Sequence, residues 1–451
     1  MRRIHLFIYL LGCSILIPSV LVSAQQPQAT PAPGATDDKA AMEKRMQDLE
    51  DRIVTLEGEI RQLKAQGAQP AQPAAAPTAT PSAEAAQAQP AAAQPATAPT
   101  SQAEAVRLGG AGGAAAKALN PDISMIGDFI GSAGHNPINP TPSFQMHESE
   151  LGVQAIIDPY ARGDFFISFG EEGVELEEGY ITFTALPAGF VAKGGKMRAA
   201  FGKVNALHNH VLPWVDRPLV TQNLVGNEDG IDDAGLSVQR IIPAPAGWFL
   251  EGTGQVFRGD SADIFTASNK NDVSVVGHLR SYKDLSESTN IDVGASYSRG
   301  HNLFGSDFIT HLYGIDATLR WKPLQRSIYH SFVARSEFIW RQQDQPAVCG
   351  LGAACPAFLS PGYQRAFGFY TSADYQFARR WFVGGRVDRS DRPFDAALTD
   401  KGGSLVLTYW PSEFAQIRGQ YRFTHYAENF DAHEAFLQLQ FALGAHGAHP
   451  F

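Results

Sequence analysis

The chain has 451 residues, with 36 lysine and arginine residues against 46 aspartate and glutamate residues, and a formal net charge of −10. This acidic balance argues against nucleic acid as a partner, because nucleic-acid-binding proteins gather basic residues into one footprint. The composition excludes little else, so the class of protein has to be inferred from the pattern along the chain.

The first 24 residues have the features of a secretory signal peptide. Arg2 and Arg3 precede an apolar stretch from Ile4 to Val22, and Ser23-Ala24 supplies the small residues of a cleavage site. We therefore predict a signal peptide over residues 1–24. A lipoprotein is the alternative, because Leu10-Leu11-Gly12-Cys13 is similar to a lipobox, although the apolar run continues past Cys13. No later run reaches the ~18 apolar residues of a transmembrane helix.

Heptad spacing appears over residues 39–66. The apolar seam consists of Met42, Met46, Leu49, Ile53, Leu56, Ile60 and Leu63. Its alternating steps of four and three indicate a short parallel coiled coil, and isoleucine at position a with leucine at d favours two strands. A lone amphipathic helix is the alternative. Residues 67–118 are dominated by Ala, Pro and Gln, which cannot bury enough apolar surface to fold, and they predict a disordered linker.

From residue 119 to 451 the chain changes to alternating, aromatic-rich segments separated by turn residues. Within 311–321, for example, Tyr313, Ile315 and Leu319 alternate with Asp316 and Arg320. This period of two indicates strands, and the expected fold is an all-β, transmembrane, antiparallel β-barrel of about sixteen strands. The expected centres are residues 126, 150, 166, 179, 196, 237, 252, 277, 293, 316, 335, 370, 384, 407, 420 and 439.

Three features favour lipid over water as the solvent of these strands. Tryptophans gather at strand ends, as in an interfacial aromatic girdle: Trp321, Trp340, Trp381 and Trp410. A near-terminal amphipathic strand, 434–443, is similar to the signal read by outer-membrane assembly machinery. Connections after even-numbered strands are short, and those after odd-numbered strands are mostly longer, notably 203–232 and 342–361. This asymmetry is typical of outer-membrane barrels whose N-terminus is periplasmic.

The segments resemble the phosphate-selective porin O/P family. The resemblance rests on the opening strand 123–129, on Ala200-Phe201-Gly202-Lys203 before the long loop, and on 233–239 after it. It implies an outer-membrane channel, an inward constriction loop and a homotrimer. The chain is also similar to proteins labelled zinc-regulated outer-membrane receptors, but such receptors need a plug inside ~22 strands, which residues 119–451 cannot supply.

In such a barrel, inward charges and any inward loop set the selectivity. The expected pore-lining residues are Lys196, Arg198, Arg280, Arg320, Arg335, Arg386, Arg418 and Arg422. The guanidinium fork suits phosphate and carboxylate, so anions are the first expected solutes. Inward carboxylates oppose this and support an alternative in which opposite charges brace the wall: Asp292, Asp316, Glu337, Asp374 and Asp388. The third loop has no dense cluster of lysine or arginine, so phosphate is not singled out.

The third outer loop, 203–232, is the expected constriction loop because it is the longest. Its candidate residues are His208, His210, Trp214, Asp216, Arg217, Asn223, Asn227, Glu228 and Asp229. His208 and His210 would share one side of an extended segment, where imidazoles could bind zinc or copper. The tail pair His446 and His449 offers a weaker version of the same pattern.

Two other groups of residues have less specific expectations. Cys349 and Cys355 would form a disulfide in an oxidising compartment. The acidic run of Glu171, Glu172, Glu175, Glu177 and Glu178 could hold calcium, but a solvated loop edge is the simpler interpretation.

The expected function is a passive channel for small hydrophilic solutes, without enzymatic activity or cofactor. The chain has no Gly-x-Ser-x-Gly or His-Glu-x-x-His pattern to suggest a hydrolase. Two alternatives remain. One is a structural anchor that contacts the cell wall through its coiled coil; the other is an uptake receptor for a metal or another ligand.

Overall fold

The structure is a computed structural model that describes residues 121–171, 173–261, 264–346 and 361–444. The predicted signal peptide, coiled coil and linker lie outside the described residues, as do Cys349, Cys355, His446 and His449.

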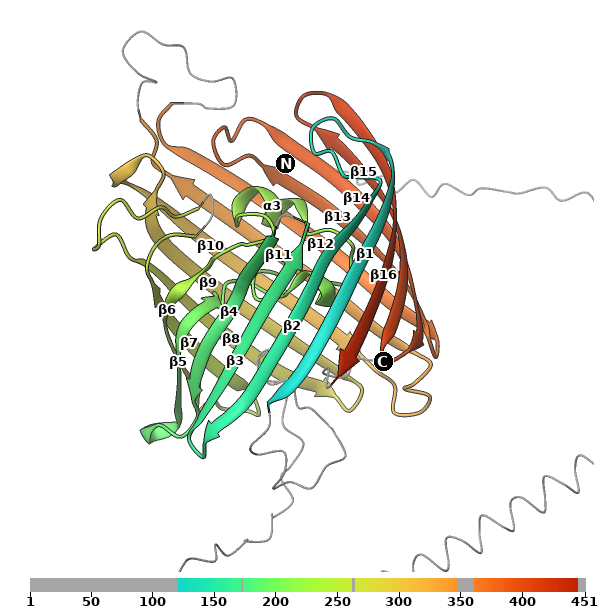
Figure 1. The fold of residues 1–451 in the computed structure, drawn as a ribbon, viewed down its shortest axis with the longest axis horizontal. Helices are drawn as coiled ribbons and strands as arrows, with labels where there is room; N and C mark the ends of the chain where they lie inside the picture. The colour runs from blue at the N-terminus through green and yellow to red at the C-terminus, as the bar shows by residue number, and fades with distance from the viewer. Residues whose placement is uncertain (1–120, 172, 262–263, 347–360, 445–451) are drawn as a thin grey trace, which may run out of the picture. The chain divides into compact units, whose positions relative to one another are not determined.

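The described residues form a closed antiparallel barrel of sixteen strands (Figure 1). The strands are β1 (Asp122–His135), β2 (Phe144–Asp158), β3 (Ala161–Gly170), β4 (Gly173–Phe183), β5 (Phe190–Arg198), β6 (Asp232–Ile242), β7 (Phe249–Phe257), β8 (Ser274–Ser286), β9 (Thr289–Asn302), β10 (Gly305–Trp321), β11 (Ser331–Gln343), β12 (Gln364–Ala378), β13 (Trp381–Asp391), β14 (Thr399–Ser412), β15 (Ala415–Tyr426) and β16 (Phe430–Gly444). Each strand pairs with its neighbours in sequence, and β1 pairs with β16 from Ser124–Gly444 to His135–His433. Every predicted strand centre falls within one of these strands, so the expected barrel is confirmed.

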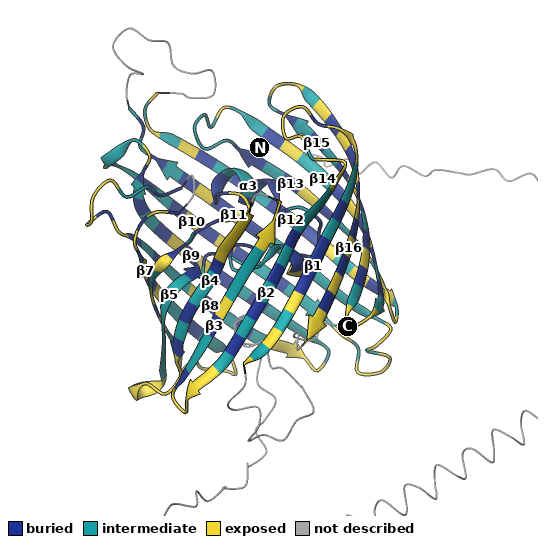
Figure 2. Cartoon of the chain, viewed as in Figure 1, coloured by how far each residue is buried: buried dark blue, intermediate teal, exposed yellow. Residues whose placement is uncertain are grey.

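Side-chain alternation assigns each residue to one face of the wall. On β14, Leu405 and Leu407 are exposed on the outer face, whereas Ser404, Val406 and Thr408 are buried toward the interior. Successive side chains of a strand point to opposite faces. Each strand therefore has an outward row and an inward row, and together these rows produce an apolar outside and a mostly polar inside. Figure 2 shows the resulting alternation of buried and exposed positions along the strands. This distribution is the reverse of that in a water-soluble barrel and indicates lipid outside.

The connections at the two ends of the barrel differ in length, with exceptions. After most even-numbered strands the chain turns quickly, as at 159–160 and 379–380, although the connection after β10 extends over 322–330. The connection after β5 runs from 199 to 231. Two odd-numbered connections, 171–172 and 303–304, are as short as the tight turns. The asymmetry therefore depends on a few long loops rather than on every outer connection.

One of the four predicted girdle tryptophans faces the interior. Trp340 and Trp381 are exposed on the outer face, and Trp381 stacks on Tyr409 with ring centroids 4.5 Å apart. Trp410 lies on the inward row of β14 and is buried. Its sequence position next to Pro411 marks a strand end but not a face, so its assignment to the girdle was wrong.

The connection 199–231, called here the third loop, contains the short helices η3 (Asn209–Val211) and α3 (Leu219–Leu224). Helix α3 contacts β11, β12, β13 and β14, and it lies within the barrel in Figure 1. Another short helix, η2 (Pro187–Gly189), forms the turn between β4 and β5. Among the described residues, no helix has the length and apolar character needed to cross a membrane.

A charge in the middle of the outer face should destabilise the barrel in lipid. Leu405 is 67% exposed at the centre of the outer row of β14. Leu405→Arg should cost about 2–4 kcal/mol, the usual penalty for arginine at mid-membrane depth. Lys401→Arg introduces arginine on the same face but near the strand end, at a position that is already positively charged. It should lower the free energy of unfolding by only about 0–1 kcal/mol. Urea unfolding of both variants in lipid vesicles measures the difference; equal stabilities would contradict the assignment of this face to lipid.

Candidate functional site

The third loop enters the barrel through contacts of its own backbone with the wall. Glu337 of β11 accepts hydrogen bonds from the backbone N–H groups of Lys203 (2.7 Å) and Val204 (3.3 Å). The Lys203 Nζ atom lies 2.9 Å from Asp292 Oδ1 on β9. Gly202 has a φ of +61°, and a Cβ atom there would collide with the Glu337 carboxylate. The start of the loop is therefore fixed against β9 and β11 and requires glycine at position 202.

The middle of the loop is held by a single carboxylate, Asp216. Its Oδ2 atom lies 2.8 Å from Arg386 on β13 and 3.0 Å from Arg422 on β15. Gln420 of β15 donates a side-chain hydrogen bond to Oδ1, and Arg386 also donates to the Asp216 carbonyl at 2.9 Å. Two strands that are not neighbours are thus tied to one residue of the loop. We call Asp216, Arg386 and Arg422 the arginine clamp.

Trp214 packs beside this clamp. The Trp214 ring lies edge-on to Tyr370 with centroids 5.2 Å apart, and the Arg386 guanidinium lies 4.8 Å from its centroid. Arg418 donates to the Trp214 carbonyl at 3.2 Å. The indole is 1% exposed, so it is part of the packed interior of the barrel and does not line open water.

An apolar core forms inside the barrel, between the loop and the wall. The loop contributes Phe201, Val204, Leu212, Trp214, Val220, Leu224, Val225 and Ile231, and the wall contributes, among others, Leu312, Ile339, Tyr370 and Val406. Burial of these side chains stabilises the inward position by the hydrophobic effect, which is proportional to the apolar area removed from water. The ion pairs give this position its register, and the apolar contacts give it much of its stability.

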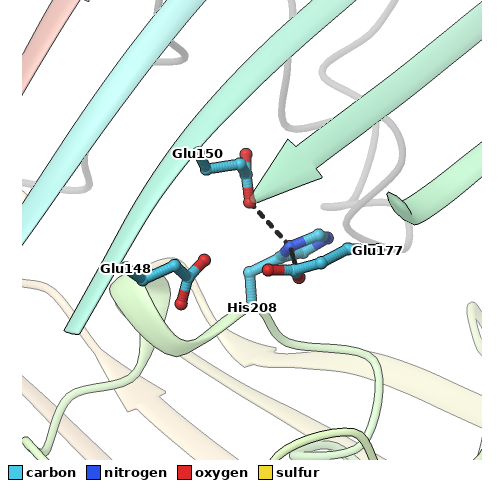
Figure 3. A group of neighbouring side chains, drawn as sticks. All are labelled: Glu148, Glu150, Glu177 and His208. Atoms are coloured by element: carbon cyan, nitrogen blue, oxygen red, sulfur yellow. Dashed lines mark ion pairs between the residues drawn. The ribbon is translucent and has the colours of Figure 1, made fainter. Parts of the chain in front are cut away.

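His208 lies against the wall formed by β2 and β4 (Figure 3), and His210 contacts β2. The Nδ1 atom of His208 is 2.8 Å from both Glu150 Oε2 and Glu177 Oε2, and its Nε2 atom is 2.9 Å from Glu178 Oε2. Burial lowers the pKa of His208, but these carboxylates outweigh it and hold that pKa well above its usual value. His210 Nδ1 lies 3.5 Å from Glu148 Oε1. We call Glu148, Glu150, Glu177, Glu178, His208 and His210 the histidine–glutamate cluster.

Two sequence-based interpretations of this region are wrong. His208 and His210 do not lie on an extended segment, because residues 209–211 form η3, and their ring centroids are 5.7 Å apart with planes tilted by 41°. Glu177 and Glu178 are not a solvated loop edge, since β4 carries them into contact with His208. Glu175 does remain exposed, 3.3 Å from Lys196.

All eight predicted pore-lining cations lie on the wall strands, and carboxylates pair with seven of them. The pairs are Lys196–Asp232, Arg198–Glu177, Arg280–Asp292, Arg320–Asp292, Arg335–Asp374, Arg386–Asp388 and Arg422–Glu434. The eighth, Arg418, donates to Gln438 at 2.8 Å as well as to the loop. Asp316, another predicted inward carboxylate, lies 3.5 Å from Lys203 Nζ. These contacts are those of the bracing alternative, in which opposite charges tie the wall together.

The remaining predicted loop residues have separate places. Arg217 is buried and donates to the carbonyls of Val204 (3.0 Å) and Leu207 (2.6 Å), so it holds the loop to itself. Asn223 donates to Asp400 of β14 at 3.1 Å. Asn227 has a φ of +59° in the turn after α3. Glu228 and Asp229 are exposed at the end of the loop, and their carbonyls accept from Arg198.

Glu148 and Glu150 belong to the site but were not predicted from the sequence. They stand two residues apart on the inward row of β2, in the segment His147-Glu148-Ser149-Glu150. Two buried acidic positions on the inward face of a strand need cationic partners, because burying an unpaired charge is costly. That spacing was the available signal, but it does not say which of the 13 histidines would supply a partner.

Comparison with one solved structure supports the architecture. No family profile matches the chain. An uncharacterized protein of Aquifex aeolicus (strain VF5) is 27% identical over 395 residues, covering 74% of this chain and 81% of that protein. The structure of Pseudomonas putida OprB superposes with a TM-score of 0.50 at 10% identity, covering 73% of this chain and 95% of OprB. The chain has the porin fold. The outer membrane channel DcaP of Acinetobacter baumannii gives a TM-score of 0.46 at 11% identity, over 72% of this chain and 96% of DcaP.

The arginine clamp should resist mild acid. Burial alone would raise the pKa of Asp216, but Arg386 and Arg422 outweigh it and hold that pKa at about 2. A lowered folded pKa adds stability that is present above the unfolded value and is lost as the pH falls through the folded value. The contribution of Asp216 should therefore persist down to about pH 4 and vanish between about pH 4 and 2.

The fluorescence of Trp214, taken as the difference between wild type and Trp214→Phe, reports this transition because Trp214 packs against Arg386. Asp216→Asn removes the titrating group, so its fluorescence should lack the change in this window. A change in the Trp214 signal between about pH 4 and 2 that is as large in Asp216→Asn as in wild type would contradict the assignment of the transition to Asp216.

Proposed function

We propose that this chain is an outer-membrane porin, a passive diffusion channel for small hydrophilic solutes. One observation carries the proposal: a barrel with an apolar outside and a polar inside encloses a long loop that the wall holds in place at Glu337, Asp216 and His208. A loop fixed inside a porin-type barrel narrows the aqueous path, and the side chains that line this narrowing select the solute.

The pairing of the inward charges supports weak ion selectivity. The sequence made anions the first expected solutes. However, an arginine that forms an ion pair with a carboxylate attracts a passing anion less strongly than an unpaired arginine does. Asp292, for example, contacts Arg280 at 2.7 Å and Lys203 at 2.9 Å. We therefore propose that the channel passes small solutes of either charge, and that the paired arginines mainly brace the wall and the loop.

Location and assembly belong to the same proposal. The apolar outer face supports insertion in a bilayer, and the resemblance to phosphate-selective porins implies the outer membrane of a bacterium and a homotrimer. The N-terminal region would then lie in the periplasm, where the predicted coiled coil could contact the cell wall. An anchor without a channel is the rival function, and conductance distinguishes the two.

The reversal potential across a salt gradient tests the selectivity. Purified full-length protein in a planar bilayer should give ohmic currents, with a reversal potential much closer to zero than that of an ideally anion-selective or cation-selective pore. This follows from the cancellation of paired charges along the path. A folded, inserted barrel that carries no current would refute the channel, whereas a near-ideal anion potential would refute only the weak selectivity.

The arginine clamp should control the current through single channels. In Asp216→Asn, Arg386 still contacts Asp388 and Arg422 still contacts Glu434. The decrease in the free energy of unfolding should therefore be smaller than the ~3–5 kcal/mol typical of a broken buried ion pair, and the barrel should still fold. The freed loop should raise both the mean conductance and the current noise.

Lys401→Arg is the control, because Lys401 is exposed on the outer face of β14, away from the barrel interior, and this change should leave the current unchanged. Wild-type conductance and noise in Asp216→Asn would show that the clamp does not set the aperture.

A further inference from the structure

The histidine–glutamate cluster brings several metal-binding side chains to one point. One ligand atom from each of Glu148, Glu150, Glu177 and His208 lies within 4.8 Å of the others (Figure 3). Two strands and the loop supply them: β2 carries Glu148 and Glu150, β4 carries Glu177, and the loop carries His208. The group is formed by the folded barrel with its loop inside, since these residues are far apart in sequence.

Glu148 is the member whose contacts are incomplete. Glu148 is 5% exposed, and its carboxylate oxygens make no close hydrogen bond to a described residue. Its nearest cation contact is His210 Nδ1 at 3.5 Å, too long for a strong charged hydrogen bond. Glu177, by contrast, has Arg198 at 3.0 Å. A buried carboxylate normally has hydrogen-bonded partners or a metal ion, because desolvation of its charge is costly.

We propose that Glu148, Glu150, Glu177 and His208 bind a divalent transition-metal ion and that this ion ties the third loop to β2 and β4. Carboxylate oxygen with imidazole nitrogen is a donor set that zinc accepts, whereas magnesium and calcium take oxygen ligands. In a tetrahedral zinc site the donors lie about 3.4 Å apart, given zinc–ligand distances of about 2.0–2.2 Å.

Zinc titration of the full-length protein tests the site. Protein in detergent, stripped with EDTA, is titrated with ZnCl₂ by calorimetry, and its thermal unfolding is followed with and without zinc. Wild type should bind zinc at this site and unfold at a higher temperature when zinc is present. Glu148→Gln should weaken that binding by at least about tenfold, as expected for loss of a ligand.

Glu148→Gln is suited to this test because it should leave the metal-free protein folded. The substituted amide keeps the shape of the side chain, keeps an oxygen that can face His210, and removes a negative charge next to Glu150. Glu251→Gln is the control, since Glu251 is an equally buried inward glutamate on β7, outside the cluster. It should bind zinc as wild type does.

Three outcomes would overturn the proposal. Wild type could bind no zinc. Glu148→Gln could bind it with wild-type affinity, which would place the zinc elsewhere, for instance at His446 and His449. Magnesium could bind and protect as well as zinc does, which would remove the role of His208. None of these results bears on conductance, so the proposed channel function would stand or fall separately.

Discussion

One carboxylate, that of Asp216, joins the third loop to two strands of the wall. Its contacts with Arg386 and Arg422 place the middle of the loop inside the barrel, and Trp214 packs beside them. Arg386 and Arg422 each contact a wall carboxylate as well, Asp388 and Glu434, so Asp216 joins the loop to charge pairs that the wall itself contains. The inward position of the middle of the loop depends on this arrangement.

The wall is built to receive the loop, as its interior is not uniformly polar. Leu312, Ile339 and Val406 occupy inward positions that alternation would leave to polar residues, and all three pack in the core shared with the loop. The loop meets a carboxylate of β11 at Lys203, glutamates of β2 and β4 at His208, and arginines of β13 and β15 at Asp216. It is therefore a structural element of the barrel interior, with contacts on several sides of the wall.

The strands could be predicted from sequence because each has lipid on one face and polar surroundings on the other. Apolar and polar residues therefore alternate along every strand, and this alternation can be recognised in each segment by itself. The inward position of the loop could not, because it depends on contacts such as Asp216 with Arg422 that are some 200 residues apart. Local patterns misled at two places: η3 replaces the extended segment expected around Asn209, and Trp410 turns inward. Apolar Leu312, Ile339 and Val406 on otherwise polar rows were the available signal that something packs inside.

Limited proteolysis measures the inward loop most directly. Trp214 is 1% exposed inside the barrel, whereas Lys270, in the connection between β7 and β8, is exposed. In the folded protein in detergent, trypsin should cut after Lys270, and chymotrypsin should leave the bond after Trp214 intact although it cuts there in the heat-unfolded chain. Mass spectrometry of the fragments gives both rates. Chymotryptic cleavage after Trp214 in the folded protein, as fast as in the unfolded chain, would mean that the loop lies outside the barrel, and the account of the clamp and the aperture would be wrong.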